Sequence, residues 1–175
     1  MRWQDTNTQT CSIARSMSVF GDRWTLLVIR QIFMRIRRFS EIQSSLGIPK
    51  HRLSDRLSRL VEDGVVYKDA YDKAGKRFDY KLTEKGLALY PVVVAIAQWG
   101  DAWLADDDGN PLEYVHKTCG HSAHPKVCCT VCNESITAHN TYAIPGPGIL
   151  KKVERDEFSD TDMLLYSKSL GTDTA

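Results

Sequence analysis

The chain has 175 residues, of which 42% are hydrophobic, so it is long enough for one domain with a buried core and for an extension. Its first ten residues, MRWQDTNTQT, contain no apolar segment of the kind found in secretory signals. No apolar run approaches membrane-spanning length either. These features argue against a secreted or membrane-bound protein, and we expect a cytoplasmic one.

The net charge is only +1, but the charges are unevenly distributed along the chain. Residues 30–81 contain 13 Lys and Arg against 7 Asp and Glu, a balance of +6. Residues 101–175 contain 6 Lys and Arg against 12 Asp and Glu, a balance of −6. This pattern predicts one region that binds a polyanion and another with a different role, although charges scattered over a solvated surface would also produce it.

The N-terminal part predicts three helices, at residues 11–20, 23–35 and 41–46. The second is apolar around most of its circumference, and Asp22 can cap its N-terminus. Ser40 can cap the third. We therefore expect the second helix to lie at the centre of the core.

A fourth helix is predicted from Lys50 to Asp63, after the turn at residues 47–49 and before Gly64. A proline at the helix entrance costs little, because its missing N–H would have no helical partner there. The apolar residues recur at i, i+4, i+7 and i+8 and form one stripe: Leu53, Leu57, Leu60 and Val61. The first turn of this helix, KHR, is cationic.

After Gly64 the pattern changes to two β-rich runs at residues 65–71 and 77–83, joined by a glycine-containing turn. Thr83 can cap the long apolar helix that follows, at residues 84–104. Pro91 either ends or bends this helix or begins a second segment.

Three parts are predicted along the chain: residues 1–104, an extension at residues 105–148 and an acidic tail at residues 149–175. An Asp-rich break at residues 106–109 marks the first boundary, and the sequence IPGPG at residues 144–148 is typical of a linker. Within the tail, the sequence MLLYSKSL is apolar enough for a short helix.

A helix, a short helix, a turn, a second helix and a hairpin, in this order, are typical of a winged helix-turn-helix, a mainly α fold with a small β-hairpin wing. The helix from Lys50 would then be the recognition helix, which places its N-terminal residues at base edges in the major groove of DNA. Residues 72–77 would form the wing, whose basic side chains can meet the phosphate backbone or the minor groove.

Twelve side chains are predicted to lie at this interface. Arginine pairs well with guanine, and a helix N-terminus favours phosphate. We assign Arg56 and Arg59 either to phosphate contacts or to salt bridges with Glu62 and Asp63. An ordinary solvated helix face would also carry such arginines, but the basic hairpin after the helix favours DNA. The predicted residues are Arg37, Arg38, Lys50, His51, Arg52, Ser54, Asp55, Arg56, Arg59, Lys73, Lys76 and Arg77.

The sequence runs CSIAR, GDRWTLLVIR, RRFSEI, LSDRLSRLVEDGVV and YKLTEKG resemble the HxlR-type winged helix-turn-helix transcriptional regulators, relatives of the MarR group. The resemblance covers about residues 11–103 and implies a homodimer that binds a palindromic operator. It also implies a dimer interface formed by the first helix and the long helix after the wing. Residues 34–36 depart from the family, which usually has a small or Gly-Pro segment there, and PKHR at residues 49–52 departs from its frequent Ser-Pro.

Cys11 stands where members of this family have a cysteine that, in some of them, senses electrophiles or oxidants. At the start of a helix the dipole would lower the pKa of the thiol, and Arg15 lies one turn further on. The alternative is a buried structural thiol at the dimer interface.

The other four cysteines lie within 14 residues, in the sequence HKTCGHSAHPKVCCTVCN. In a reducing compartment such a cluster more often binds a metal than forms disulfides. Two pairs, each followed by a Gly or Asn that tolerates positive φ, resemble the two turns of a zinc ribbon and predict a structural Zn²⁺ site. The predicted ligands are His116, Cys119, Cys129 and Cys132, with His121, His124 and His139 as competing histidines and Cys128 competing with Cys129.

The sequence as a whole predicts a dimeric DNA-binding regulator, a repressor with structural zinc, and leaves open a small-molecule or electrophile effector. The rival interpretation is a winged-helix protein-interaction module that does not bind DNA. We expect no enzyme, because the sequence contains no Ser/His/Asp set and because a metal with four protein ligands has no open position for catalysis.

Overall fold

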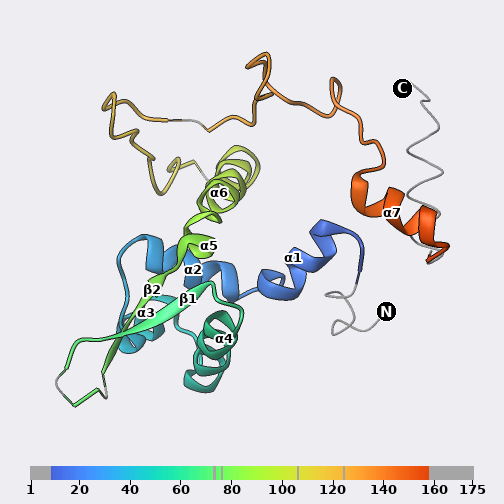
Figure 1. Cartoon of the computed structure of the whole chain (residues 1–175). Helices are drawn as coiled ribbons and strands as arrows, with labels where there is room; N and C mark the ends of the chain where they lie inside the picture. Colours follow the sequence, from blue (N-terminus) through green and yellow to red (C-terminus); the bar gives the residue numbers. More distant parts are fainter. Residues whose placement is uncertain (1–8, 73, 76, 106, 124, 158–175) are drawn as a thin grey trace. The chain divides into compact units, whose positions relative to one another are not determined.

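The computed structural model describes residues 9–72, 74–75, 77–105, 107–123 and 125–157. Figure 1 shows their helices and strands, and their contacts divide them into two compact units. One unit is formed by residues 19–126, and the other combines the chain before residue 19 with the chain after residue 126. This division does not coincide with the predicted boundaries after residues 104 and 148.

Three helices build the helix-turn-helix: α2 (Thr25–Phe33), α3 (Phe39–Leu46) and α4 (Lys50–Glu62), preceded by α1 (Ser12–Phe20). The predicted core position of α2 is confirmed, because Val28, Ile29 and Ile32 are all buried. The buried stripe of α4 comprises three of the four predicted residues: Leu53, Leu57 and Leu60.

The N-cap of α2 is Trp24 rather than the predicted Asp22, but Asp22 still binds the backbone at the start of the helix. The carboxylate of Asp22 accepts hydrogen bonds from the backbone N–H groups of Trp24 (2.9 Å) and Thr25 (3.2 Å). The prediction for α3 was wrong by two residues, because Arg38 rather than Ser40 is its N-cap. There, the N–H of Arg38 donates to the carboxylate of Glu41 (3.3 Å), which replaces a serine cap.

The wing is a two-stranded antiparallel sheet of β1 (Val66–Ala70) and β2 (Phe78–Leu82), paired from Val66 opposite Leu82 to Ala70 opposite Phe78. The Thr83 hydroxyl closes its base by donating to the carbonyl oxygen of Gly64 (2.7 Å) and by accepting from the N–H of Gly86 in α5 (Glu84–Leu87). This confirms the predicted hairpin and the predicted Thr83 cap.

Helix α6 (Tyr90–Leu104) has Pro91 in its first turn, so this proline begins a second segment rather than bending one helix. Among the hydrophobic side chains of α6, only Val94 is buried. By length and composition alone, the helical stretch Glu84–Leu104 could cross a membrane, which corrects the prediction that no apolar run approaches that length.

In the other unit, α7 (Pro147–Arg155) occupies a region that was predicted as a linker and a polar tail. That prediction was wrong because Pro147 begins a helix here, at a first-turn position where its missing N–H is not needed. Basic Lys152 and Arg155 in the last turn suit the helix dipole. The short helix predicted within MLLYSKSL lies outside the described residues.

Candidate nucleic-acid interface

The first turn of α4 presents three exposed side chains, those of Lys50, His51 and Arg52. The buried leucines hold the opposite side of the helix against the core, so this turn faces solvent. None of the three side chains forms an ion pair with a residue that the structure describes. The cations therefore remain available to an anionic ligand at a helix N-terminus.

The second and third turns of α4 are arranged differently, because Asp55 lies between two arginines. Its carboxylate is 3.2 Å from Nη2 of Arg56 and 3.3 Å from Nε of Arg59. Arg56 also reaches the carboxylate of Asp22 at 3.1 Å, and its side chain is only 16% exposed. The ion pairs found here thus differ from the predicted alternative of pairs with Glu62 and Asp63.

Arg56 consequently fixes α4 to the start of α2. Burial raises the pKa of Asp22, but hydrogen bonds from Thr25 and Trp24 and the charge of Arg56 outweigh it, so its pKa lies below the ordinary value. Sequence reasoning missed this link because nothing local relates two residues 34 positions apart.

Arg38 lies at the base of the wing. Its guanidinium stacks on the ring of Tyr71 at 4.8 Å and approaches Asp79 (3.7 Å) and Glu41 (3.8 Å). An open groove of about 590 Å³ lies here between α3 and the wing, and Arg77 contributes to its lining. This groove joins two of the predicted DNA-binding residues, Arg38 and Arg77.

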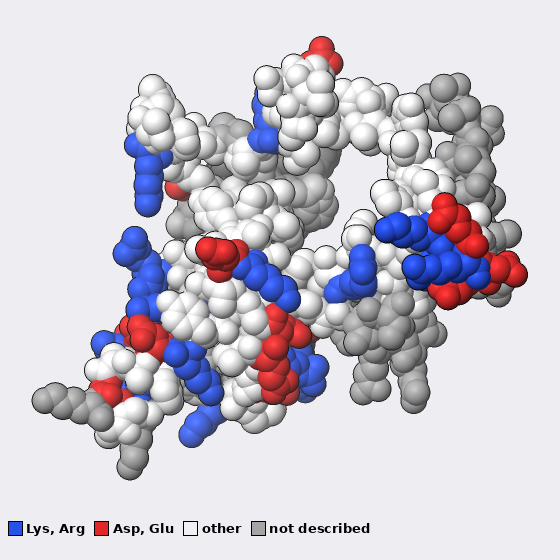
Figure 2. Space-filling view, viewed as in Figure 1, with Lys and Arg blue, Asp and Glu red and all other residues white. Residues whose placement is uncertain are grey.

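The remaining predicted residues fall into three groups. Ser54 is exposed on α4 beside the cationic turn. Arg37 is half-buried, its carbonyl oxygen accepts from the N–H of Tyr80 (2.9 Å), and its Nε is buried without a hydrogen-bond partner among the described residues. Lys73 and Lys76 lie outside the described residues. On the face in Figure 2, Lys and Arg side chains gather over the helix-turn-helix and the wing, with acidic side chains among them.

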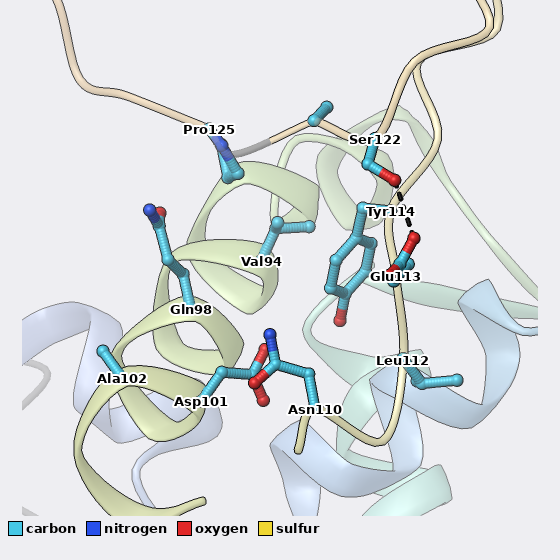
Figure 3. A pocket seen from close by; sticks show the side chains of 11 residues that line it. Val94, Gln98, Asp101, Ala102, Asn110, Leu112, Glu113, Tyr114, Ser122 and Pro125 are labelled. Carbon is cyan, nitrogen blue, oxygen red and sulfur yellow. Dashed lines mark hydrogen bonds between the residues drawn. The ribbon is translucent and has the colours of Figure 1, made fainter.

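A second cavity, of about 260 Å³, lies between α6 and the segment that follows it (Figure 3). Polar side chains of both segments line it, among them Gln98, Asp101 and Glu113. Burial raises the pKa of Tyr114 at its wall, and nearby Tyr90 and Asp101 raise it further. No motif in the sequence indicated this cavity, because its walls come from segments with no common pattern.

The four predicted metal ligands form two pairs, one in each unit. In the first knuckle (residues 114–123), His116 Nδ1 lies 3.3 Å from Cys119 Sγ. In the second knuckle (residues 127–136), hydrogen bonds from the N–H groups of Cys132 and Val131 lower the pKa of Cys129. Among the described residues, no group of three or more His, Cys, Asp or Glu side chains converges as a metal site would require.

Cys11 directly precedes α1 and is partly exposed. Its carbonyl oxygen accepts from the N–H of Arg15 (3.1 Å), while the guanidinium of Arg15 donates to the Ser12 hydroxyl (3.3 Å). The predicted position at a helix start is therefore confirmed, and the Arg15 side chain is directed to Ser12.

Residues 19–108 match the family model described as HxlR-like helix-turn-helix. Rv3095 of Mycobacterium tuberculosis, an HTH-type transcriptional regulator, is 42% identical over 142 residues, which are 81% of this chain and 90% of the relative. The crystal structure of PA1607, a candidate transcription factor, superposes with a TM-score of 0.73 at 33% identity and covers 81% of this chain and 99% of its own. The oxidised form of the redox regulator HypR superposes with a TM-score of 0.50 at 26% identity, over 55% of this chain and all of its own.

The similarity to Rv3095 extends beyond the winged helix. The alignment with Rv3095 is longer than the family match and only residues 1–18 precede that match, so the alignment includes part of the region after residue 108. The extension is thus shared with at least one relative. The family match, together with 42% identity over most of both chains, shows that this protein belongs to the HxlR-like helix-turn-helix family of transcriptional regulators.

Proposed function

We propose that the protein is a homodimeric repressor that acts in the cytoplasm by binding a two-fold symmetric DNA operator. The observation that carries this proposal is the exposed cationic turn at the start of α4, formed by Lys50, His51 and Arg52, which makes no ion pair with a described residue. In a winged helix-turn-helix this turn enters the major groove, where such side chains can contact both guanine and phosphate.

The ion pairs of α4 support a division of roles along the helix. Arg56 is held by Asp22 and Asp55 and orients the helix, whereas Lys50 and Arg52 are available to the nucleic acid. Arg59 is more exposed than Arg56, with 59% of its side chain accessible. It can therefore leave its ion pair with Asp55 and contact a phosphate of the DNA backbone instead. Affinity should fall steeply with salt, because binding would release counterions from the DNA.

The dimer is supported by the exposed apolar surface of α6. The side chains of Ile96, Trp99 and Trp103 are 49%, 59% and 74% exposed. Large apolar side chains that lie this exposed along one helix are unusual in a monomer, so they indicate a contact surface. Burial of these side chains against a second copy would remove a large apolar area from water. A symmetric pair of recognition helices would then face successive major grooves on one side of the DNA.

The test is a selection of genomic fragments with the purified protein, followed by footprinting and affinity measurements. The variant carries Lys50→Ala and Arg52→Ala, and its matched control carries Lys151→Ala and Arg155→Ala, which remove the same charge from α7. We expect enrichment of a two-fold symmetric site, with affinity reduced at least about tenfold in the α4 variant and unchanged in the control.

Equal loss in both variants would mean that the binding is only a general charge effect. Absence of any enriched site at low salt would contradict DNA binding and favour the protein-interaction module. Titration of the fragment with protein also tests the dimer, because two protomers per symmetric site are expected.

We further propose that Cys11 makes DNA binding thiol-responsive. Its partial exposure at the start of α1 and the structural similarity to the redox regulator HypR support this. Treatment with a disulfide-forming oxidant should change the operator affinity of the native protein but not that of Cys11→Ser. An identical response of both proteins would assign the effect to other cysteines.

A further inference from the structure

The cavity between α6 and the segment that follows it lies entirely within one compact unit, residues 19–126 (Figure 3). Its volume of about 260 Å³ is slightly below the roughly 300–1,000 Å³ of sites for drug-sized ligands, so it suits a smaller molecule. A cavity of roughly 150 Å³ can hold benzene, which leaves room here for one ring and a short side chain. Neither the predicted DNA-binding side chains nor Cys11 contribute to its walls.

One wall of the cavity is a single face of α6, formed by residues at i, i+4, i+7 and i+8: Val94, Gln98, Asp101 and Ala102. The exposed side chains that are proposed for the dimer are those of Ile96, Trp99 and Trp103. At about 100° per residue, these three side chains point to the opposite side of the helix. Pairing of α6 with a second copy therefore does not require the face that lines the cavity.

The other wall is formed by residues 110–125, which include the first knuckle. The N–H of Ala123 donates to the carbonyl oxygen of Tyr114 (2.6 Å), and Val115 forms a β-bridge with Ser122. The Ser122 hydroxyl also donates to the carboxylate of Glu113 (2.7 Å). These contacts bring side chains from both arms of the first knuckle to the same wall.

The charged groups of the lining are acidic. Asp101 and Glu113 contribute two carboxylates, and no Lys, Arg or His is present among the described residues that line the cavity. Asp101 forms no salt bridge with a described residue. The hydroxyl of Tyr114 is directed toward the end of the cavity where Asp101 and Asn110 lie (Figure 3). Burial raises the pKa of this phenol and the charge of Asp101 raises it further, whereas Arg30 acts in the opposite direction from outside the lining. The cavity therefore carries negative charge beside an aromatic ring.

Apolar side chains complete the lining. Val94 is only 3% exposed, and Leu112, Ala123 and Pro125 line the cavity from the other wall. A bare ion such as Ca²⁺ takes about six to eight oxygen ligands and makes no use of such a surface, whereas hydrocarbon packs against it. The combination of carboxylates and apolar walls favours an organic cation over a metal ion.

Both walls also lie in the region of the chain that aligns with Rv3095. An aligned stretch of 142 residues in a chain of 175 must include residues 34–142, which contain α6 and the whole first knuckle. The cavity is therefore built from a part of the chain that this relative shares, although the family match itself ends at residue 108.

We propose that this cavity is a binding site for a small organic cation, a primary amine on a short apolar or aromatic body. The ammonium group of the ligand donates to the Asp101 carboxylate and lies near the ring of Tyr114, because charge-assisted hydrogen bonds and the ring quadrupole both favour a cation there. The apolar body of the ligand packs on Val94 and Leu112. A neutral molecule of the same shape lacks the first contact, and an anion is repelled by both carboxylates.

The experiment titrates the full-length, reduced protein with phenethylamine and follows the backbone NMR signals of residues 94–102 and 110–123. Two probes of similar size separate charge from shape: the neutral phenethyl alcohol and the anionic phenylacetate. We expect the amine to shift these signals and to bind at least about tenfold more tightly than the alcohol, and phenylacetate to bind more weakly than either.

Three variants locate the binding. Asp101→Asn keeps the shape of the cavity but removes the charge, so the affinity for the amine should fall to that for the alcohol. Its matched control is Asp107→Asn, which removes an exposed carboxylate outside the lining and should leave both affinities unchanged. Ala102→Leu fills part of the cavity from α6 and should weaken the binding of amine and alcohol alike.

The titration contains no DNA, so its outcome does not depend on the proposed function. NMR signals of residues 25–82 that coincide in all four proteins show that the variants are folded. Signals that stay unchanged when the amine is added to the native protein would mean that the cavity holds only water, which would overturn the proposal. Equal affinities for amine and alcohol, or an Asp101→Asn variant that binds the amine as the native protein does, would also overturn it, because the cavity would then not select a cation.

Discussion

The winged helix-turn-helix and the extension are stabilised in different ways, although both consist of short elements joined by tight turns. Residues 25–82 bury side chains from every helix and from the wing, including Ile29, Ile42 and Leu57. Among the described residues after Val94, no hydrophobic side chain is buried. Burial of apolar area therefore stabilises the first region, whereas the described part of the second has no comparable core.

Helix α6 stands between these two cases. It is as apolar as a core helix, but most of its side chains are exposed in the single chain. This contrast shows that apolar composition indicates where a surface will be covered, but not by what.

The largest effect is expected for removal of a core side chain. Leu57→Ala should lower the free energy of unfolding by about 2–5 kcal/mol, because the leucine is 1% exposed and its loss leaves a cavity. Val131→Ala in the extension should change it by less than about 0.5 kcal/mol, because that valine is 90% exposed. Urea unfolding followed by circular dichroism measures both. Similar losses in the two variants would show that the regions do not differ in burial.

The next effect concerns the dimer. Trp103→Asp should weaken self-association by at least about 2 kcal/mol, roughly 30-fold in Kd, because it places a charge in the proposed interface. Tyr142→Asp is the control, since that side chain is 79% exposed and lies outside α6. Sedimentation equilibrium gives both constants. A native protein that is monomeric at micromolar concentration would remove the basis for a partner at α6.

Asp22→Asn should lower the free energy of unfolding by about 1–2 kcal/mol at pH 7, because it removes the negative charge that pairs with Arg56 and strengthens the hydrogen bond from Trp24. Since the pKa of Asp22 is lower in the folded chain than the ordinary 3.8, the ionised carboxylate stabilises the fold above that pH. This contribution is lost as the pH falls through the lowered value. The difference between the native protein and the variant should therefore narrow below pH 3.8 in acid unfolding. A constant difference down to pH 2 would refute the assignment.

The smallest effect is expected at Arg35, which adopts a φ of 66° in the segment where the family usually has a small residue. Arg35→Gly should raise the free energy of unfolding by about 0.5–1 kcal/mol through relief of this strain. Gly47→Ala is the converse control: its φ is 61° and its Cβ would meet no atom within 4 Å, so any loss reflects conformation alone. Thermal unfolding compares the pair, and opposite signs are expected.

Much of the winged helix was predictable because its signals are local. The leucine spacing of α4, the glycine-containing turn of the wing and Thr83 before α5 each act within a few residues. The role of Arg56 was not predictable, since it depends on Asp22 from a distant part of the chain. The start of α7 was missed because a proline between glycines is typical of linkers as well as of helix starts.

The backbone hydrogen bonds of the first knuckle recur 13 residues later in the second knuckle, and this repeat was hidden for a different reason. Within the ten aligned positions, the only identities are Cys119 with Cys132 and Ser122 with Ser135. The repetition lies in backbone hydrogen bonds, which many side chains permit, and in a positive φ that Gly and Asn share. The sequence predicted the two pairs of donor residues, but only the backbone showed that the two knuckles have the same construction.

The junction between the wing and α5 has a mechanical consequence. A Cβ on Gly86 would lie 2.2 Å from the carbonyl oxygen of Val65, so α5 rests directly on the backbone at the start of the wing. A helix seated this closely cannot tilt without displacing the strand beneath it. In a dimer joined through α6, the crossing angle of the two α6 helices would therefore set the distance between the two wings and so the operator spacing that the dimer can span.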